Sequence, residues 1–237
     1  MNILALDATA IAASCAVASD AHTLAEFRVD NGLTHSELLL PMAEACLHAG
    51  QMQIGDIDLF ACTVGPGSFT GVRIGVATVK GLAFGTGKRC AAVSTLEALA
   101  ENLMPLSGIY CATMNARRGQ VYNALFENRD GVLTRLCPDR AISLEALAKE
   151  LCEQYHGFKV RPVGDGYDIT LPYLKEAGVR VLETPENLRL QSAASVARCA
   201  WRMALTGNTV SDTALVPLYL RLPQAERDRL AKQQPEG

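Results

Sequence analysis

The sequence has 237 residues, of which 49% are hydrophobic and 20% are charged, and its net charge at pH 7 is −3. This composition is typical of a soluble protein with a sizeable core, built from one large or two small domains. Lys and Arg do not cluster along the chain, so the sequence does not indicate a protein that holds RNA on its own.

The eight cysteines form no Cys-x-x-Cys pair, so the spacing of a zinc site is absent and we expect buried, reduced thiols. The N-terminus carries no positive charge before its first apolar run, which argues against a signal peptide. No charge-free apolar stretch reaches the length of about 18 residues that a membrane-spanning helix needs. We therefore expect a cytoplasmic protein that does not contact a membrane.

Strands and helices alternate in the first half of the sequence. Apolar runs predict strands at residues 3–6, 14–18, 25–29, 59–64 and 91–93, and helical patterns occupy residues 34–49, 70–84 and 96–103. Thr34 and Glu37 have the spacing of a capping box at the start of the first helix, which Pro41 should kink. The order β-β-β-α-β-α-β-α indicates an α/β layer fold.

The second half begins with the same plan as the first. Strands are predicted at residues 109–114 and 120–126 around a turn at 115–119, followed by helix 144–154, strand 159–163, helix 169–177, strand 180–182 and helix 191–205. Asp7 and Asn115 end the first strand of each half and are 108 residues apart. The two halves are therefore interpreted as similar α/β units.

The most distinctive stretch is the sequence GPGSFTGVRIG at residues 65–75, between a predicted strand and a predicted helix. Ser68 or Thr70 can cap the helix. A helix N-terminus favours phosphate, but the stretch is not a P-loop, because Gly71 is followed by Val72 and Arg73 instead of Lys and Ser or Thr. It also lacks the Gly-x-Ser-x-Gly frame of a nucleophile elbow. A tight turn between strand and helix remains the simpler interpretation.

Small residues recur at every fourth position of the helix that follows this turn. Ala77, Gly81 and Gly85 share one face, which permits close approach of another helix. Interior glycines cost about 1 kcal/mol each relative to alanine. We expect the helix to recover this cost by packing against a helix of this chain or of a partner.

The GPGSFTGVRIG stretch resembles the signature of the TsaB (YeaZ) family of bacterial tRNA threonylcarbamoyladenosine biosynthesis proteins. Other segments agree in the same order, namely ILALD at 3–7, His35, VSTL at 93–96, ARRGQVY at 116–122 and PLYLR at 217–221. The resemblance covers about residues 1–222. It implies an actin-like ATPase (ASKHA) fold with two RNase H-like subdomains at 1–104 and 105–222, each a mixed sheet flanked by helices, followed by a polar tail at 223–237.

In actin-like ATPases the two strand-turn-strand hairpins grip the nucleotide phosphates. The resemblance therefore places a vestigial nucleotide site at Asp7, Thr9, Asn115 and Arg118. The companion glycines are missing after Asp7, and an amide at position 115 cannot supply charge to Mg²⁺. Asp7 can equally bond turn N–H groups, and the neighbouring hairpin arginines can simply be exposed. Gly164-Asp165-Gly166 fits a turn, or a position beside adenosine.

Metal binding and catalysis are not expected from the residues present. TsaD, the related catalytic subunit, carries a His-x-x-x-His metal pair, and none of the four histidines here has that spacing. Peptidase activity is not expected either, because the sequence has no metal-binding pair and no nucleophile with its general base. No catalytic residue and no metal ligand is therefore predicted.

The resemblance implies a non-catalytic partner of TsaD, required for threonylcarbamoyl transfer to N6 of adenosine 37 in ANN-decoding tRNAs. It implies a complex with TsaD and TsaE in which ATP or ADP and Mg²⁺ act, no intrinsic cofactor, only indirect contact with tRNA, and a homodimer when the chain is alone. The alternative is an actin-fold small-molecule kinase or ATPase active on its own. The predicted partner interface consists of His35, Leu38, Leu39, Met42, Arg73, Ile74, Ala77, Thr78, Gly81 and Leu82.

Overall fold

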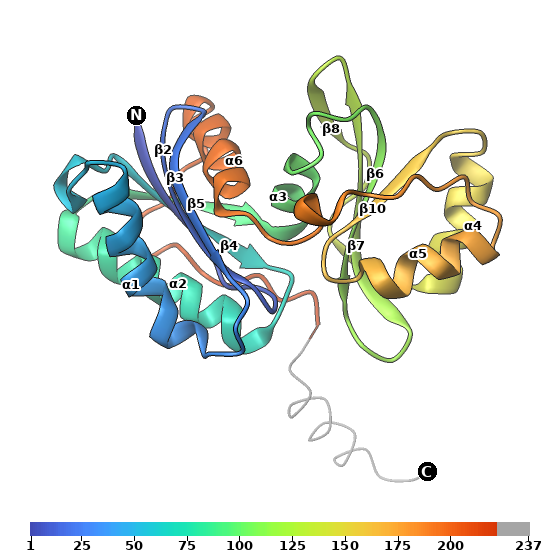
Figure 1. Cartoon of the computed structure of the whole chain (residues 1–237), viewed down its shortest axis with the longest axis horizontal. Helices are drawn as coiled ribbons and strands as arrows, with labels where there is room; N and C mark the ends of the chain where they lie inside the picture. The colour runs from blue at the N-terminus through green and yellow to red at the C-terminus, as the bar shows by residue number, and fades with distance from the viewer. Residues whose placement is uncertain (222–237) are drawn as a thin grey trace, which may run out of the picture.

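A computed structural model describes residues 1–221, and the predicted polar tail at 223–237 lies outside the described residues. The first sheet, on the left in Figure 1, has five strands in the order β3-β2-β1-β4-β5. They are β1 (Asn2–Asp7), β2 (Ala13–Ser19), β3 (His22–Val29), β4 (Leu59–Gly65) and β5 (Arg89–Ser94). β2 is antiparallel to β1 and β3, whereas β4 is parallel to β1 and β5 is parallel to β4.

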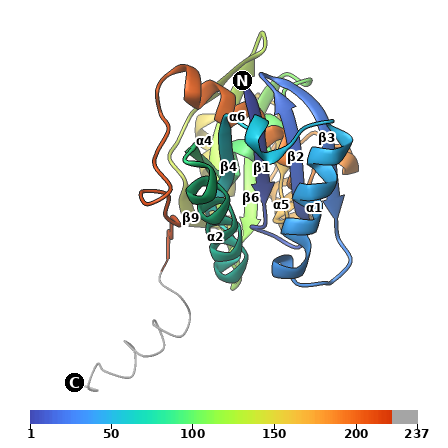
Figure 2. The same ribbon diagram turned by 90° about the vertical axis from the view of Figure 1, so that its left-hand side faces the viewer.

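Helices cover both faces of this sheet. On one face lie α1 (His35–Ala49) and α2 (Phe69–Thr86), which Figure 2 shows in front of the sheet. A short 3₁₀ turn, η1 (Ile54–Asp56), precedes β4. The inner strands β1, β2 and β4 are buried along nearly their whole length, because apolar side chains on both of their faces meet a helix layer.

The second sheet repeats the arrangement of the first. Its order is β10-β6-β7-β8, and β9 pairs with β7. The strands are β6 (Gly108–Asn115), β7 (Gln120–Arg129), β8 (Val132–Arg135), β9 (Arg140–Ser143) and β10 (Val160–Val163). β6, β7 and β8 form an antiparallel meander and β10 is parallel to β6, as β4 is to β1. The predicted strand at 180–182 is reduced to a single parallel bridge between Val181 and Val160.

These two mixed sheets confirm the predicted α/β fold of two RNase H-like units, each a mixed sheet flanked by helices. Helices α4 (Leu144–Gln154) and α5 (Tyr167–Glu176) cover the outer face of the second sheet, and α3 (Thr95–Glu101) lies between the sheets (Figure 1). The turn η2 (Glu186–Leu188) leads back toward the first unit. Asp7 and Asn115 end β1 and β6, so the predicted equivalence of these two positions is also confirmed.

The last helix, α6 (Ala193–Leu205), belongs to the first unit in space. Val196, Ala197 and Ala200 pack with Ile3 and Ala5 on the face of the first sheet opposite α1 and α2. The predicted second subdomain at 105–222 is therefore wrong in its final part. The physical reason is that α6 presents alanines and Cys199 on one face, and this flat face fills the otherwise open side of the first sheet.

Local signals at the element ends were correct in part. The Ser68 and Ser94 hydroxyls each accept a bond from the backbone N–H three residues on, as N-caps of α2 and α3. The capping box at Thr34 was a wrong prediction, because Thr34 accepts no cap bond and its hydroxyl lies 3.3 Å from that of Ser36. All eight cysteines are free and six are buried. No helix among residues 1–221 is long and apolar enough to span a membrane.

Candidate functional site

The glycines of the GPGSFTGVRIG stretch allow three backbone segments to touch. A Cβ at Gly71 would lie 1.9 Å from the carbonyl oxygen of Ala8, and one at Gly67 would lie 2.6 Å from that of Thr9. At Gly65, where φ is +123°, a Cβ would lie 2.4 Å from the carbonyl oxygen of Leu218. No other residue type fits at these contacts, so the stretch is a packing joint between the first hairpin, the start of α2 and the C-terminal segment.

The first hairpin, residues 7–13, is held down on this joint. The Ser68 N–H donates to the Thr9 carbonyl at 2.7 Å. The His35 Nε2 lies 2.7 Å from the Ala10 carbonyl, so this histidine braces the hairpin from the start of α1. These bonds occupy the carbonyl groups at the tip of the hairpin and fix its position against α1 and α2.

Asp7 lies buried beneath the hairpin. Its Oδ1 accepts from the Thr9 N–H at 2.8 Å and from the Thr9 hydroxyl at 2.6 Å, while its Oδ2 has no partner. Burial raises the pKa of Asp7 to about 6, although the bonds from Thr9 oppose the rise. The sequence left open that Asp7 is a structural residue at the end of a strand, whose carboxylate accepts hydrogen bonds from turn N–H groups. The structure shows Asp7 in this role.

The second hairpin, residues 115–120, is closed in a similar way. The Asn115 Oδ1 accepts from the Arg117 N–H at 2.8 Å, and the Asn115 N–H donates to Asp165 Oδ1 at 3.2 Å. Arg117 and Arg118 both have positive φ and exposed side chains. Burial raises the pKa of Asp165 to about 6, and the nearby charge of Asp7 adds to the rise.

The two hairpins face each other across a cleft with a volume of about 770 Å³. The structure thus brings the predicted residues Thr9, Asn115 and Arg118 to one cavity, while Asp7 lies below its surface. Sequence reasoning missed part of the lining, namely Ser68, Phe69, Tyr122 and residues 218–221. The PLYLR segment at 217–221 could have indicated that residues 218–221 line the cleft, because it contains all four of them.

The chemistry of the cleft is limited by these internal bonds. The Thr9 N–H, which could otherwise meet a phosphate, is taken by Asp7, and the Arg117 N–H is taken by Asn115. Among residues 1–221, no group of three or more His, Cys, Asp or Glu side chains is placed to hold a metal ion. The polar groups that remain in the lining are hydroxyl, amide and guanidinium groups and the carboxylate of Asp165, beside apolar side chains such as Ile11 and Met114.

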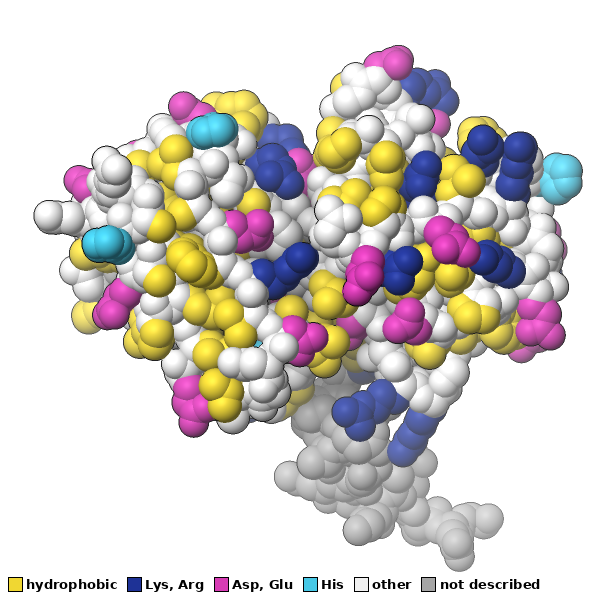
Figure 3. Space-filling model, in the orientation of Figure 1, with side chains coloured by type: hydrophobic (Ala, Val, Ile, Leu, Met, Phe, Trp, Pro, Cys, Tyr) yellow, Lys and Arg dark blue, Asp and Glu magenta, His cyan; other side chains and the backbone are white. Residues whose placement is uncertain are grey.

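Helices α1 and α2 form the other candidate site. Within it, Ala77, Gly81 and Gly85 are exposed, and a Cβ at Gly81 or Gly85 would meet no atom within 4 Å. Among the large apolar side chains of residues 1–221, Phe84 is the most exposed, at 79%, and Leu40 of α1 is 51% exposed. Figure 3 shows hydrophobic side chains over the part of this face that is visible at the left. This row of small residues, Ala77, Gly81 and Gly85, therefore lies on the surface of the chain and is not buried inside it.

The predicted interface residues do not all lie on that surface. Leu39 and Met42 are buried in the core against the first sheet, so the prediction that they are interface residues is wrong. The side of α1 that carries them is the side turned toward the sheet. Half-buried side chains that pack against the same core are Leu38, Ile74 and Leu82. The Thr78 hydroxyl bonds the Ile74 carbonyl at 2.9 Å, and Arg73 lies exposed over the Phe69 ring.

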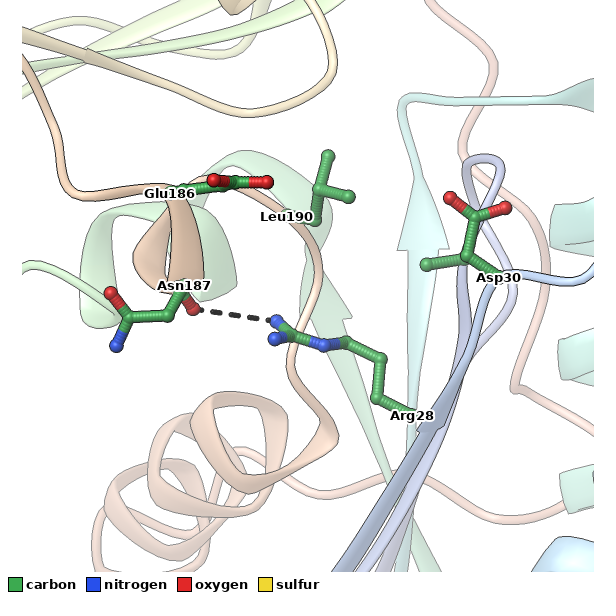
Figure 4. Close-up of a pocket in the computed structure, with 6 residues that line it drawn as sticks. Arg28, Asp30, Glu186, Asn187 and Leu190 are labelled. Atoms are coloured by element: carbon green, nitrogen blue, oxygen red, sulfur yellow. Dashed lines mark hydrogen bonds between the residues drawn. The ribbon is translucent and has the colours of Figure 1, made fainter.

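A second cavity, of about 500 Å³, lies between β3 and η2 (Figure 4). Arg28 points across it, and its Nη1 lies 3.5 Å from the Asn187 carbonyl. Asp30 and Glu186 stand on the two sides of this contact in the figure. All three charged side chains are exposed and their charges have both signs, so this cavity specifies no class of ligand.

Comparison with known proteins places this geometry in a family. A family model described as TsaD, tRNA N6-adenosine threonylcarbamoyltransferase, matches residues 32–227. The tRNA threonylcarbamoyladenosine biosynthesis protein TsaB of Bacillus subtilis is 34% identical over 230 residues, which cover 95% of this chain and 96% of the relative. The TsaB protein of Escherichia coli is 33% identical over 223 residues, which cover 93% and 95%.

A solved structure agrees with the sequence relatives. A Pseudomonas aeruginosa protein, described as uncharacterized with similarity to peptidase YeaZ, matches with a TM-score of 0.80 at 25% identity. The match covers 93% of this chain and 99% of that one. The chain belongs to the TsaB (YeaZ) family of tRNA threonylcarbamoyladenosine biosynthesis proteins.

Proposed function

We propose that this chain is a non-catalytic partner subunit of TsaD, required for threonylcarbamoyl transfer to N6 of adenosine 37 in ANN-decoding tRNAs. The observation that carries the proposal is the exposed face of α1 and α2, with its row of small residues. Membership of the TsaB family indicates that the chain acts in tRNA threonylcarbamoyladenosine biosynthesis. The match to the TsaD family model supports a partner of related fold.

The α2 surface is suited to a helix of another chain. Without side chains at Gly81 and Gly85, a second helix can approach the α2 backbone closely and gain dispersion contacts along its length. Phe84 of α2 and Leu40 of α1 are exposed and would lose apolar exposure on binding, while Arg73 remains at the rim. A four-helix contact with the α1–α2 equivalent of TsaD satisfies these features.

The same face would serve a homodimer when TsaD is absent. A two-fold contact uses one surface patch on both copies, so the homodimer and the TsaD complex would compete for α1 and α2. Binding of TsaD would then lower the population of the homodimer by mass action.

The assignment of a non-catalytic role is supported by the state of the two hairpins. Their turn N–H groups bond Asp7 and Asn115 within the chain, so they do not form the open cradle that phosphates need. We therefore assign ATP or ADP and Mg²⁺ to the complex with TsaD and the ATPase TsaE, and no cofactor to this chain. With a net charge of −3, the chain would meet tRNA only through its partners.

A reconstitution tests this function. Threonylcarbamoyl transfer to tRNA is measured with purified TsaD and TsaE, with and without this chain, and ATP turnover is measured for the chain alone. The proposal predicts transfer that requires the chain, and no turnover by the chain alone. Transfer that proceeds equally well without it would contradict the proposal. Turnover of ATP by the chain alone would favour the alternative of a self-sufficient ATPase or small-molecule kinase.

A further inference from the structure

The C-terminal strap, residues 209–221, runs along the first unit and ends on the second. Near its start, Val210 exchanges two backbone hydrogen bonds with Cys90 of β5, at 2.8 and 2.9 Å. Lys80 of α2 donates to the carbonyl of Leu215 at 3.2 Å, and the Leu215 side chain is fully buried in the core under α1 and α2. This part of the strap is therefore anchored in the first unit.

The middle of the strap meets the glycine joint. The Leu218 N–H donates to the Val64 carbonyl at 2.7 Å, beside Gly65. The Tyr219 ring lies on the Phe69 ring with a centroid distance of 4.8 Å. Because Phe69 is the first residue of α2, the strap holds the start of the helix that carries the exposed small-residue row.

The end of the strap crosses the mouth of the cleft. Arg221 Nη1 donates to the Ala116 carbonyl at 3.3 Å, and its Nη2 donates to Gln120 Oε1. Both acceptors belong to the second hairpin, whereas every strap contact described above is with the first unit. Arg221 is half-buried and lines the cleft.

We propose that Arg221 is a latch that holds the second hairpin, and with it the second unit, against the first unit. At the cleft floor the units meet through apolar contacts, since Ala10 of the first hairpin packs in one cluster with Met114, Leu96 and Leu99. Such contacts permit small rotations about the floor. A bidentate guanidinium at the mouth opposes that rotation, because opening the cleft breaks both of its hydrogen bonds at once.

The latch also joins two sites that are separate in the sequence. A displacement of the start of α2 would move Phe69, and with it the Tyr219 ring that lies on Phe69. Arg221 is two residues after Tyr219 in the strap. The strap therefore links the α2 surface to the second hairpin, and release of Arg221 would uncouple them. This inference does not depend on which partner binds α2.

Hydrogen exchange measured by mass spectrometry tests the latch in the full chain. Arg221→Ala should accelerate exchange at the amides of Ala116 and Gln120 about tenfold, the effect of losing a hydrogen bond to a charged group. Exchange in β1 and β4 should not change. Arg221→Lys, which keeps the charge but loses the planar fork, should give an intermediate acceleration, and it serves if the alanine variant does not fold.

Two further variants complete the test. Gln120→Ala removes one acceptor while leaving the strap intact, and it should also accelerate exchange of the hairpin. Arg129→Ala removes an arginine of β7 that is 74% exposed and pairs with Glu127, and it should leave the hairpin unchanged. The latch would be overturned if Arg221→Ala left exchange of the second hairpin unchanged, or if it accelerated exchange in β1 and β4 as much as in the hairpin. It would also be overturned if Arg129→Ala accelerated exchange of the hairpin as much as Arg221→Ala does.

Discussion

Substitution of Gly71 by alanine should destabilise the chain far more than substitution of the other glycines of α2. The added Cβ would lie 1.9 Å from the Ala8 carbonyl oxygen, so either the first hairpin or the start of α2 must move. That movement also strains the bond from Ser68 to Thr9 and the contact of His35 with Ala10, both of 2.7 Å.

The magnitude follows from these contacts. Overpacking costs about 1–3 kcal/mol, and each weakened hydrogen bond costs about 1 kcal/mol. We expect a total loss of roughly 3 kcal/mol, a large part of the roughly 5–15 kcal/mol that stabilises a typical protein. For a chain of this size that loss lowers the melting temperature by roughly 6–12 °C.

Two matched variants isolate the cause. At Gly75 a Cβ would lie 3.6 Å from the Ala8 Cβ, an ordinary contact, and at Gly81 it would meet nothing. Gly81→Ala should therefore stabilise the chain by roughly 1 kcal/mol through helix propensity, and Gly75→Ala should be near neutral or slightly stabilising. Guanidinium and thermal unfolding followed by circular dichroism measure all three. A Gly71→Ala variant as stable as the parent, or a Gly75→Ala variant that loses as much, would refute the packing joint.

Two other predictions concern the buried carboxylate and the cleft. The folded-state pKa of Asp7 is raised to about 6, so the folded chain keeps this proton when the unfolded chain has lost it, and stability falls as the pH rises from about 4 to about 6. Asp7→Asn should remove this loss and raise the free energy of unfolding at pH 7.5 by up to about 3 kcal/mol, with a smaller gain at pH 4. Urea unfolding at the two pH values measures it, and a variant less stable than the parent at pH 7.5 speaks against the burial argument. The purified chain should hydrolyse ATP no faster than a blank, because the hairpin N–H groups are already bonded. Turnover that Asp7→Ala abolishes would show the opposite.

The sequence predicted what is set by local patterns. Helix α4 lies at the residues expected, because its apolar spacing and the cap at Ser143 are both local. The repeated topology was predicted from two strand-turn-strand patterns. The first strand ends at Asp7 in one pattern and at Asn115 in the other. By contrast, α6 was placed in the wrong unit, since an alanine-rich face does not specify which sheet it covers.

The candidate site was predictable only where one segment determines it. The shared face of Ala77, Gly81 and Gly85 follows from helical spacing alone, whereas its exposure is known only from the structure. The burial of Leu39 and Met42 depends on how α1 is rotated against the sheet, which its apolar residues on several sides leave open. The roles of Gly71 and Arg221 depend on backbone carbonyls that lie 63 and 105 residues away in the sequence, at Ala8 and Ala116. No local pattern reports such contacts.

The most direct measurement of the central claim is co-purification of TsaD from the same organism with Gly81→Leu. In the isolated chain the Cβ of this leucine meets no atom within 4 Å, so the monomer should stay folded, with an unchanged circular dichroism spectrum. Lys149→Leu, at a 74% exposed position of α4 on the second unit, is the control for an added surface leucine. The account predicts that Gly81→Leu loses TsaD and also dimerises less, while the control retains both interactions. A folded Gly81→Leu chain that binds TsaD as well as the parent does would contradict it.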